Sequence, residues 1–122
     1  MGSKSRSKGA RGEREAAAFL NSLGFTAERN GRNGYSADDL IVKELPNVHI
    51  EVKRDESIDV GTVALSEALS QAGSNAGGRV AVVLWRKNRG GWRLTYLGEH
   101  GFSVTCVAFG VVLLWLNERN RP

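Results

Sequence analysis

The chain has 122 residues, of which 41% are hydrophobic and 25% are charged, a size and composition typical of one folded domain. These values exclude a disordered chain, and the single cysteine excludes an internal disulfide framework. The net charge of +4 is unevenly spread, because residues 1–12 and 68–98 contain basic residues and no acidic ones. Such a distribution offers basic surface to a polyanion, although a soluble basic protein without such a partner could carry it as well.

The apolar segments of the sequence are short. The longest, residues 104–116, falls below the ~18 residues that a membrane-spanning helix needs. The polar and basic start of the sequence differs from a secretory signal. We therefore expect a cytoplasmic protein without membrane contact, encoded by a cell or by a phage that acts in its host's cytoplasm.

The basic start of the chain, residues 1–8, is predicted to be a disordered arm, and residues 9–122 a single domain. Apolar residues at helical spacing then predict a helix over residues 11–23, which Gly24 ends. Glu13 lies on the apolar stripe of this helix, an unusual place for a carboxylate. It is either a partner of the helix N-terminus or a functional group of the domain.

Three strands are predicted next, over residues 25–29, 38–43 and 48–53, with a hairpin turn at residues 44–47 between the last two. The third strand has the clearest pattern, because its side chains alternate between an apolar and a polar face. The apolar face is formed by Val48, Ile50 and Val52. The polar face carries an imidazole, a carboxylate and an ammonium group in a row, those of His49, Glu51 and Lys53.

The rest of the chain alternates between helices and strands. The pattern predicts a helix over residues 60–76, a buried strand over 79–85 and a further strand over 92–97. A last strand over residues 104–107 and a closing helix over 109–119 have weaker signals. This order predicts an α/β fold, a small mixed β-sheet flanked by helices.

Two acidic residues are predicted to meet across the turn between the second and third strands. If these strands are neighbours about 4.8 Å apart, Asp39 and Glu51 could hold one hard cation between them. The backbone carbonyl of Val52 could supply another oxygen, and Lys53 would lie beside a bound water. Glu13 could reach the same place from the helix. The alternative for Glu51 and Lys53 is an exposed face of cross-strand salt bridges.

The same residues resemble a known motif. Asp39 followed by Glu51-Val52-Lys53 resembles the bipartite motif of the PD-(D/E)xK nuclease superfamily. The opening is similar to that of archaeal-type Holliday junction resolvases and their phage relatives; it reads Lys8-Gly9-Ala10-Arg11-Gly12-Glu13-Arg14-Glu15 and leads into a helix that ends Leu23-Gly24-Phe25. The resemblance covers roughly residues 8–97.

This resemblance implies a single nuclease domain with a restriction-endonuclease-like fold. It implies a homodimer that uses Mg²⁺ or Mn²⁺ to cut phosphodiester bonds in branched DNA, above all four-way (Holliday) junctions. The catalytic residues it implies are Glu13, Asp39, Glu51 and Lys53.

The chain departs from the family pattern before the second strand. Asp38-Asp39 stands where the superfamily often has Pro-Asp, and we assign the metal to Asp39 because it directly precedes Leu40-Ile41-Val42. Ser36 is the nearest match to a loop serine of the resolvases. Gln71, on the helix after Lys53, resembles a glutamine that approaches the site in related phage nucleases, although a helix-surface glutamine explains it equally well.

Several residues are predicted to contact DNA rather than to perform the chemistry; they are Lys8, Arg11, Arg29, Arg32 and Ser36. His49 is interpreted as a polar neighbour of Glu51 or a DNA contact, and not as a general base. Two other functions remain open. One is a restriction-like or repair nuclease that acts on linear duplex or flap DNA. The other is a non-catalytic, architectural DNA-binding protein.

Overall fold

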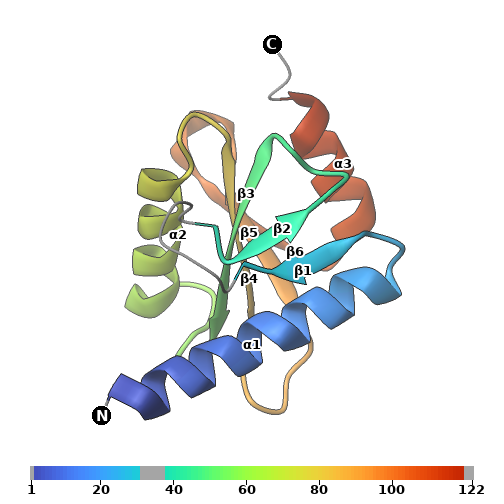
Figure 1. Ribbon diagram of the computed structural model, residues 1–122. Helices are drawn as coiled ribbons and strands as arrows, with labels where there is room; N and C mark the ends of the chain where they lie inside the picture. Colours follow the sequence, from blue (N-terminus) through green and yellow to red (C-terminus); the bar gives the residue numbers. More distant parts are fainter. Residues whose placement is uncertain (1, 31–37, 120–122) are drawn as a thin grey trace.

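The computed structural model describes residues 2–30 and 38–119. Its centre is a four-stranded mixed β-sheet (Figure 1). Its strands follow the order β3 (Val48–Arg54), β4 (Val80–Arg86), β5 (Arg93–Leu97) and β6 (Ser103–Cys106). β3 and β4 are parallel, whereas the β4–β5 and β5–β6 pairs are antiparallel. The predicted α/β class with a mixed sheet and flanking helices is therefore confirmed.

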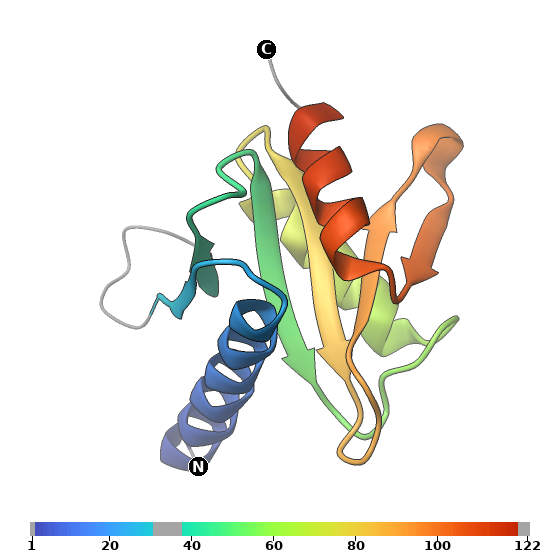
Figure 2. The same ribbon diagram turned by 90° about the vertical axis from the view of Figure 1, so that its right-hand side faces the viewer.

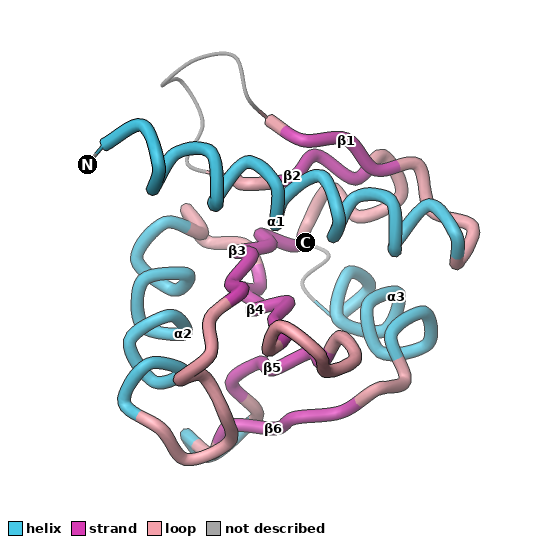
Figure 3. The backbone as a smooth tube through the Cα atoms, turned by 90° about the horizontal axis from the view of Figure 1, so that it is seen from below, coloured by secondary structure: helices cyan, strands magenta, loops and turns pink. Residues whose placement is uncertain are grey.

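Helices cover both faces of this sheet. α1 (Gly2–Ser22) and α3 (Phe109–Arg119) lie on one face, and α2 (Val63–Asn75) lies on the other (Figures 2 and 3). A short 3-10 helix, η1 (Glu99–Gly101), joins β5 to β6. No helix in the described part of the chain is long and apolar enough to cross a membrane.

The alternation of β3 places its two sets of side chains in different layers. Val48 and Ile50 are buried in the larger core, which also contains Leu20 from α1 and Leu116 from α3. His49, Glu51 and Lys53 are on the opposite, α2-covered side, as the alternating pattern predicts. The smaller core on that side is built around Trp85 of β4 and the apolar residues of α2.

Residues 2–8 belong to α1, so the prediction of a disordered arm before residue 9 is wrong for these residues. The prediction relied on the apolar stripe, whose first buried residue is Ala16. The preceding residues include no proline, and lysine and arginine are good helix formers. A helix that is packed further along can therefore extend through them, and its first turns project beyond the sheet (Figure 1).

The predicted pairing of the second and third strands is also wrong. β2 (Leu40–Val42) pairs antiparallel with β1 (Ala27–Arg29) in a separate two-stranded sheet. Leu40 and Val42 are both buried in the larger core, and backbone bonds in the turn that follows direct the chain into the other sheet. β3 then pairs with β4, a partner more distant in the sequence.

Candidate active site

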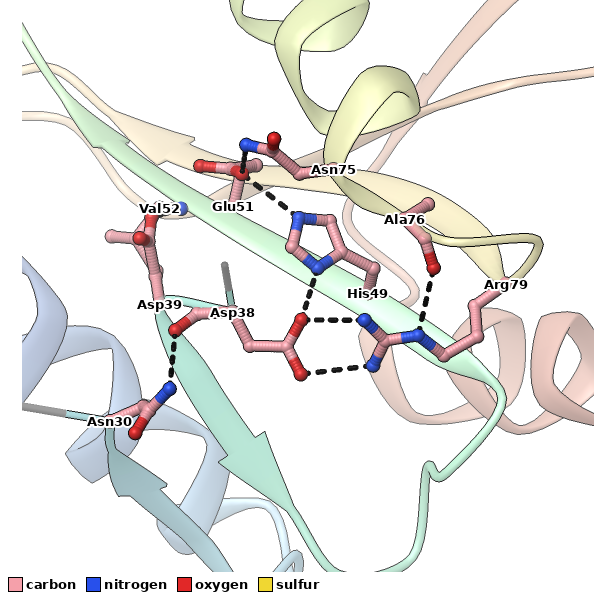
Figure 4. A network of polar contacts seen from close by, with 9 residues as sticks. All are labelled: Asn30, Asp38, Asp39, His49, Glu51, Val52, Asn75, Ala76 and Arg79. Carbon is pink, nitrogen blue, oxygen red and sulfur yellow. Dashed lines mark hydrogen bonds and ion pairs between the residues drawn. The ribbon is translucent and has the colours of Figure 1, made fainter. Parts of the chain in front are cut away.

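Asp39 joins the two sheets through its side chain. It directly precedes β2, and its Oδ2 accepts the backbone N–H of Val52 on β3 at 2.8 Å (Figure 4). The carboxylate thus bonds to β3 although β2 does not pair with that strand. Asp39 and the Glu51-Val52-Lys53 segment are therefore adjacent, as predicted, through a different connection.

A cavity of about 400 Å³ lies between this edge of β3 and α2. Five of the residues singled out from the sequence line it, namely Asp39, Glu51, Val52, Lys53 and Gln71. Two further carboxylates, Asp55 after β3 and Glu67 on α2, line it as well. The cavity lining is therefore strongly acidic, and it also includes the basic residue Lys53.

The two central carboxyls influence each other's titration. Burial, together with the nearby charges of Glu51 and Glu13, raises the pKa of Asp39 to about 7, against the opposing effect of the Val52 N–H. A hydrogen bond between the Asp39 and Glu51 carboxyls also contributes. Two neighbouring carboxylates repel each other, so it is unfavourable for both to be ionised. A cation bound between them would offset this repulsion.

The donor set at the cavity fits a hard divalent cation. Mg²⁺ and Mn²⁺ prefer oxygen ligands, and Mg²⁺ often binds through only one or two carboxylates while it keeps several waters. Asp39 and Glu51 provide two carboxylates, and Val52, whose carbonyl oxygen is the predicted third ligand, lines the same cavity. Within the described residues, no group of three or more histidine, cysteine or acidic side chains is arranged to hold a metal ion. Two carboxylates suit a cation that keeps water as its other ligands.

Asp38, the neighbour of Asp39, belongs to a different set of contacts (Figure 4). The guanidinium of Arg79 donates two hydrogen bonds to its carboxylate, at 2.9 Å to Oδ2 and 2.7 Å to Oδ1. These bonds hold the pKa of Asp38 below its usual value. Asp38 is not among the residues that line the cavity, so the structure places Asp39 there, the aspartate that the sequence favoured.

His49 connects Asp38 to Glu51. Its Nδ1 contacts Asp38 Oδ1, and its Nε2 lies 2.9 Å from Glu51 Oε1 (Figure 4). Burial would lower the pKa of His49, but the hydrogen bonds to Glu51 and Asp38 outweigh it and raise the pKa. His49 is thus a polar neighbour of Glu51, one of the two interpretations of the sequence. The imidazole is 0% exposed, so it cannot contact DNA directly.

Glu51 receives a second hydrogen bond from α2. Asn75 Nδ2 donates to Glu51 Oε1 at 3.0 Å, the same oxygen that faces His49. Burial would raise the pKa of Glu51, but the hydrogen bonds from His49, Asn75 and Asp39 together lower it. Glu51 is therefore held as a carboxylate at the cavity wall.

Glu13 lies close to this group but outside the cavity lining. Its Oε1 forms an ion pair with Arg29 Nε at 2.9 Å, and its charge contributes to the raised pKa of Asp39. Arg29, predicted to contact DNA, is thus engaged within the protein. Arg11 is exposed on α1. Arg32, Ser36 and the side chain of Lys8 lie outside the described residues.

The chain resembles a solved resolvase structure. The chain is similar to Hjc. This is a Holliday junction resolvase from the archaeal hyperthermophile Archaeoglobus fulgidus, whose structure is 24% identical in sequence and matches with a TM-score of 0.48. The match covers 77% of this chain and 85% of that one. No protein-family profile and no curated protein matches the chain.

The sequence does not predict the residues that hold Glu51 in place through hydrogen bonds, directly or through His49 and Asp38. In the sequence, Arg79 stands out only as part of a basic region, and Asn75 belongs to no motif. The one available signal was the position of His49, two residues before Glu51 on the same strand face. Arg79 and Asn75 are distant in the sequence from their partners, so no local pattern reports those contacts.

Proposed function

We propose that the chain is a metal-dependent endonuclease that hydrolyses phosphodiester bonds in branched DNA, with the four-way junction as its substrate. The observation that carries this proposal is the shared cavity of Asp39, Glu51 and Lys53. Two carboxylates can hold the divalent cation used in such hydrolysis, and an adjacent lysine can orient a water or offset negative charge on the phosphate. The motif resemblance and the basic segments of the chain support DNA as the substrate.

The residues have separate tasks in this proposal. Asp39, Glu51 and the carbonyl oxygen of Val52 hold Mg²⁺ or Mn²⁺. When bound, such a cation polarises a phosphoryl oxygen and lowers the pKa of a bound water. Lys53 orients the attacking water or offsets the negative charge that develops on the phosphate. Gln71 lines the same cavity and would contact the bound phosphate or water.

Glu13 serves this site as a catalytic acid from α1 in our proposal. Its charge already acts on Asp39, and it is held in place by Arg29. When DNA binds, a phosphate would compete with Glu13 for the guanidinium of Arg29. Arg11, on the exposed side of α1, would contact the DNA backbone together with Lys8, Arg32 and Ser36.

A homodimer would match the two-fold symmetry of a four-way junction, because two sites related by a dyad can cut two strands. The outer surface of the sheet edge and of α3 supports such a dimer. Several large apolar side chains are exposed there, and they are Phe102, Val104, Val107, Val111, Leu114 and Trp115. In this proposal they form one contiguous apolar patch, the kind of surface that marks an interaction site on a small protein.

The proposal is tested by cleavage of a labelled four-way junction beside linear duplex and flap DNA, with Mg²⁺, with Mn²⁺ and with EDTA. We expect paired, symmetric cuts in the junction alone, and only with a metal. Glu51→Gln and Lys53→Ala should abolish cutting and leave junction binding intact. Glu28→Gln and Lys43→Ala, at exposed positions outside the cavity, are the matched controls and should cut normally.

Other outcomes separate the alternatives. Metal-dependent cutting of linear or flap DNA would keep the active site and discard the junction as the substrate. Junction binding without cutting under either metal would favour the architectural DNA-binding protein. Normal cutting by both Glu51→Gln and Lys53→Ala would show that the active site lies elsewhere.

A further inference from the structure

Four polar side chains from different parts of the chain form a continuous series behind the cavity (Figure 4). Arg79, just before β4, binds Asp38 through both of its terminal nitrogens. Asp38, before β2, contacts Nδ1 of His49, and Nε2 of His49 contacts Glu51. Glu51 is the member of the series that lines the cavity, whereas His49 does not.

The contacts at Glu51 are asymmetric. His49 Nε2 and Asn75 Nδ2 both lie within hydrogen-bond distance of Oε1, at 2.9 and 3.0 Å. Two donors on one oxygen fix the rotation of the carboxylate, and they leave Oε2 outside this pair of bonds. A carboxylate held in this way keeps one orientation at the cavity wall.

As a purely structural element, this series of buried polar side chains would cost free energy of folding. Burying an imidazole between two carboxylates costs free energy that well-packed apolar side chains would avoid. Apolar residues fill the same layer next to it, including Val83 of β4 and Ala72 of α2. A fully buried histidine at this place therefore calls for a reason beyond packing.

We infer that His49 is a positioning residue that orients Glu51 for the divalent cation, with Asp38 and Arg79 fixing the imidazole from the other side. This inference rests on the proposed function, because it assigns Glu51 to the cation. His49 acts through Glu51 and touches neither the cation nor the DNA, since it is completely buried and both ring nitrogens are engaged. Hydrogen-bonded partners of metal-binding carboxylates contribute to metal affinity in this way.

Two amide substitutions separate the two contacts of His49. The amide nitrogen of Gln lies where imidazole Nε2 lies, so His49→Gln retains a donor toward Glu51 and loses the contact with Asp38. The amide nitrogen of Asn replaces Nδ1 instead, so His49→Asn retains the contact with Asp38 and loses the donor toward Glu51. Each variant thus serves as the control for the other.

The measurement is calorimetric titration of the full chain with Mn²⁺ in the absence of DNA, after urea unfolding has shown that each variant is folded. We expect His49→Asn to bind Mn²⁺ about 10–100-fold more weakly than the parent. His49→Gln should stay close to the parent. Asn75→Ala, which removes the other donor to Oε1 from a half-buried helix position, should weaken binding in the same direction. Ser74→Ala, at the adjacent exposed position, should not.

The outcomes distinguish this inference from the proposed function. Equal Mn²⁺ affinity in folded His49→Asn and the parent would overturn the inference and leave the nuclease proposal standing. Equal weakening in His49→Asn and His49→Gln would also overturn it, because it assigns the effect to the Glu51 contact. If His49→Asn binds Mn²⁺ more weakly than His49→Gln but the parent cuts no DNA, the inference is supported and the nuclease proposal is overturned. A parent chain that binds no Mn²⁺ would overturn both.

Discussion

Asp39 Oδ2 accepts the backbone N–H of Val52, and this bond takes the place of the strand pairing that the sequence predicts between β2 and β3. A backbone ladder would have used both strands' amides along their length. A side-chain contact instead brings the carboxylate itself to the edge of β3. The failed prediction of strand pairing and the successful prediction of the Asp39–Glu51 neighbourhood therefore have one cause.

Asp39→Asn is expected to stabilise the metal-free protein at alkaline pH. The folded pKa of Asp39 is raised from 3.8 to about 7, so the folded state holds a proton that the unfolded chain has released. Stability is therefore lost as pH rises between these two values. Asparagine does not titrate and can still accept the Val52 N–H. We expect a gain of about 1–4 kcal/mol in the free energy of unfolding at pH 8.

This gain should shrink toward zero near pH 4, where the parent's Asp39 is protonated in the folded state. Urea unfolding in EDTA at both pH values measures it. A variant that is less stable than the parent at pH 8 would contradict the assigned cause. Added Mn²⁺ should reverse the order of stability, because only the parent retains both carboxylates for the cation.

The Arg79–Asp38 pair is expected to behave as one unit in a double-mutant cycle. Arg79→Met removes both charge-assisted hydrogen bonds of 2.9 and 2.7 Å, whereas Asp38→Asn removes the negative charge and one of the two acceptor oxygens. Each single substitution should lower the free energy of unfolding by about 1–3 kcal/mol at pH 7. The double variant should lose less than the sum, with a coupling of about 1 kcal/mol or more. Strictly additive losses in urea unfolding would show that the two side chains act independently.

Glu44 is expected to contribute stability that acid removes. Its two carboxylate oxygens accept the backbone N–H and the hydroxyl of Thr26, each at 2.7 Å, and these bonds lower its pKa below the usual 4.5. A lowered folded pKa gives stability that is present above 4.5 and is lost as pH falls through the folded value. Glu44→Gln should therefore be less stable than the parent at pH 7, and this difference should be smaller near pH 3.

The same trend should appear in Thr26→Val, which removes the hydroxyl donor and keeps the backbone one. Its loss at pH 7 should be smaller than that of Glu44→Gln. Urea midpoints compared at the two pH values provide the test. A difference between Glu44→Gln and the parent that does not depend on pH would rule out the carboxylate as its source.

Trp115→Ser is expected to convert the proposed dimer into a monomer. The indole is 49% exposed on α3, where it contacts the ring of Tyr96 with centroids 6.2 Å apart. Large aromatic side chains at the centre of an interface commonly dominate its affinity. Light scattering after gel filtration measures the change in mass. Val60→Ser, at an exposed apolar position in the loop before α2, should leave the mass of the parent unchanged.

The loss of the dimer should carry a functional consequence. Monomeric Trp115→Ser should still bind Mn²⁺, because its site lies on the α2-covered side of β3, and it should no longer cut two strands of a junction in pairs. A parent chain that is itself monomeric would contradict the proposal of a homodimer.

The elements of this fold were largely predictable because their signals are local. Strict alternation in β3 indicated both its burial and the shared face of Glu51 and Lys53, and the closing helix α3 has the predicted bounds. Asp39 was placed correctly because it directly precedes a short apolar segment. Local patterns determine which residues share a face of a strand, and this identifies the β3 residues that line the cavity.

The pairing of the short strands and the support of Glu51 were not predictable in this way. β1 and β2 have three residues each, too few for a pattern that distinguishes one partner strand from another. Asp38 and Arg79 are separated by 41 residues, and a bidentate contact over that distance depends on the completed fold. His49 was recognised as a neighbour of Glu51, but its complete burial follows from packing against α2.

The two central carboxylates of the cavity, those of Asp39 and Glu51, belong to segments of separate sheets. Asp39 precedes β2 of the two-stranded sheet, and Glu51 lies on β3 of the four-stranded one. A cation bound to both carboxylates would cross-link the two sheets. Its binding should therefore slow hydrogen exchange at the amides of β1 and β2 more than at those of β4 and β5, which are already held within their own ladder.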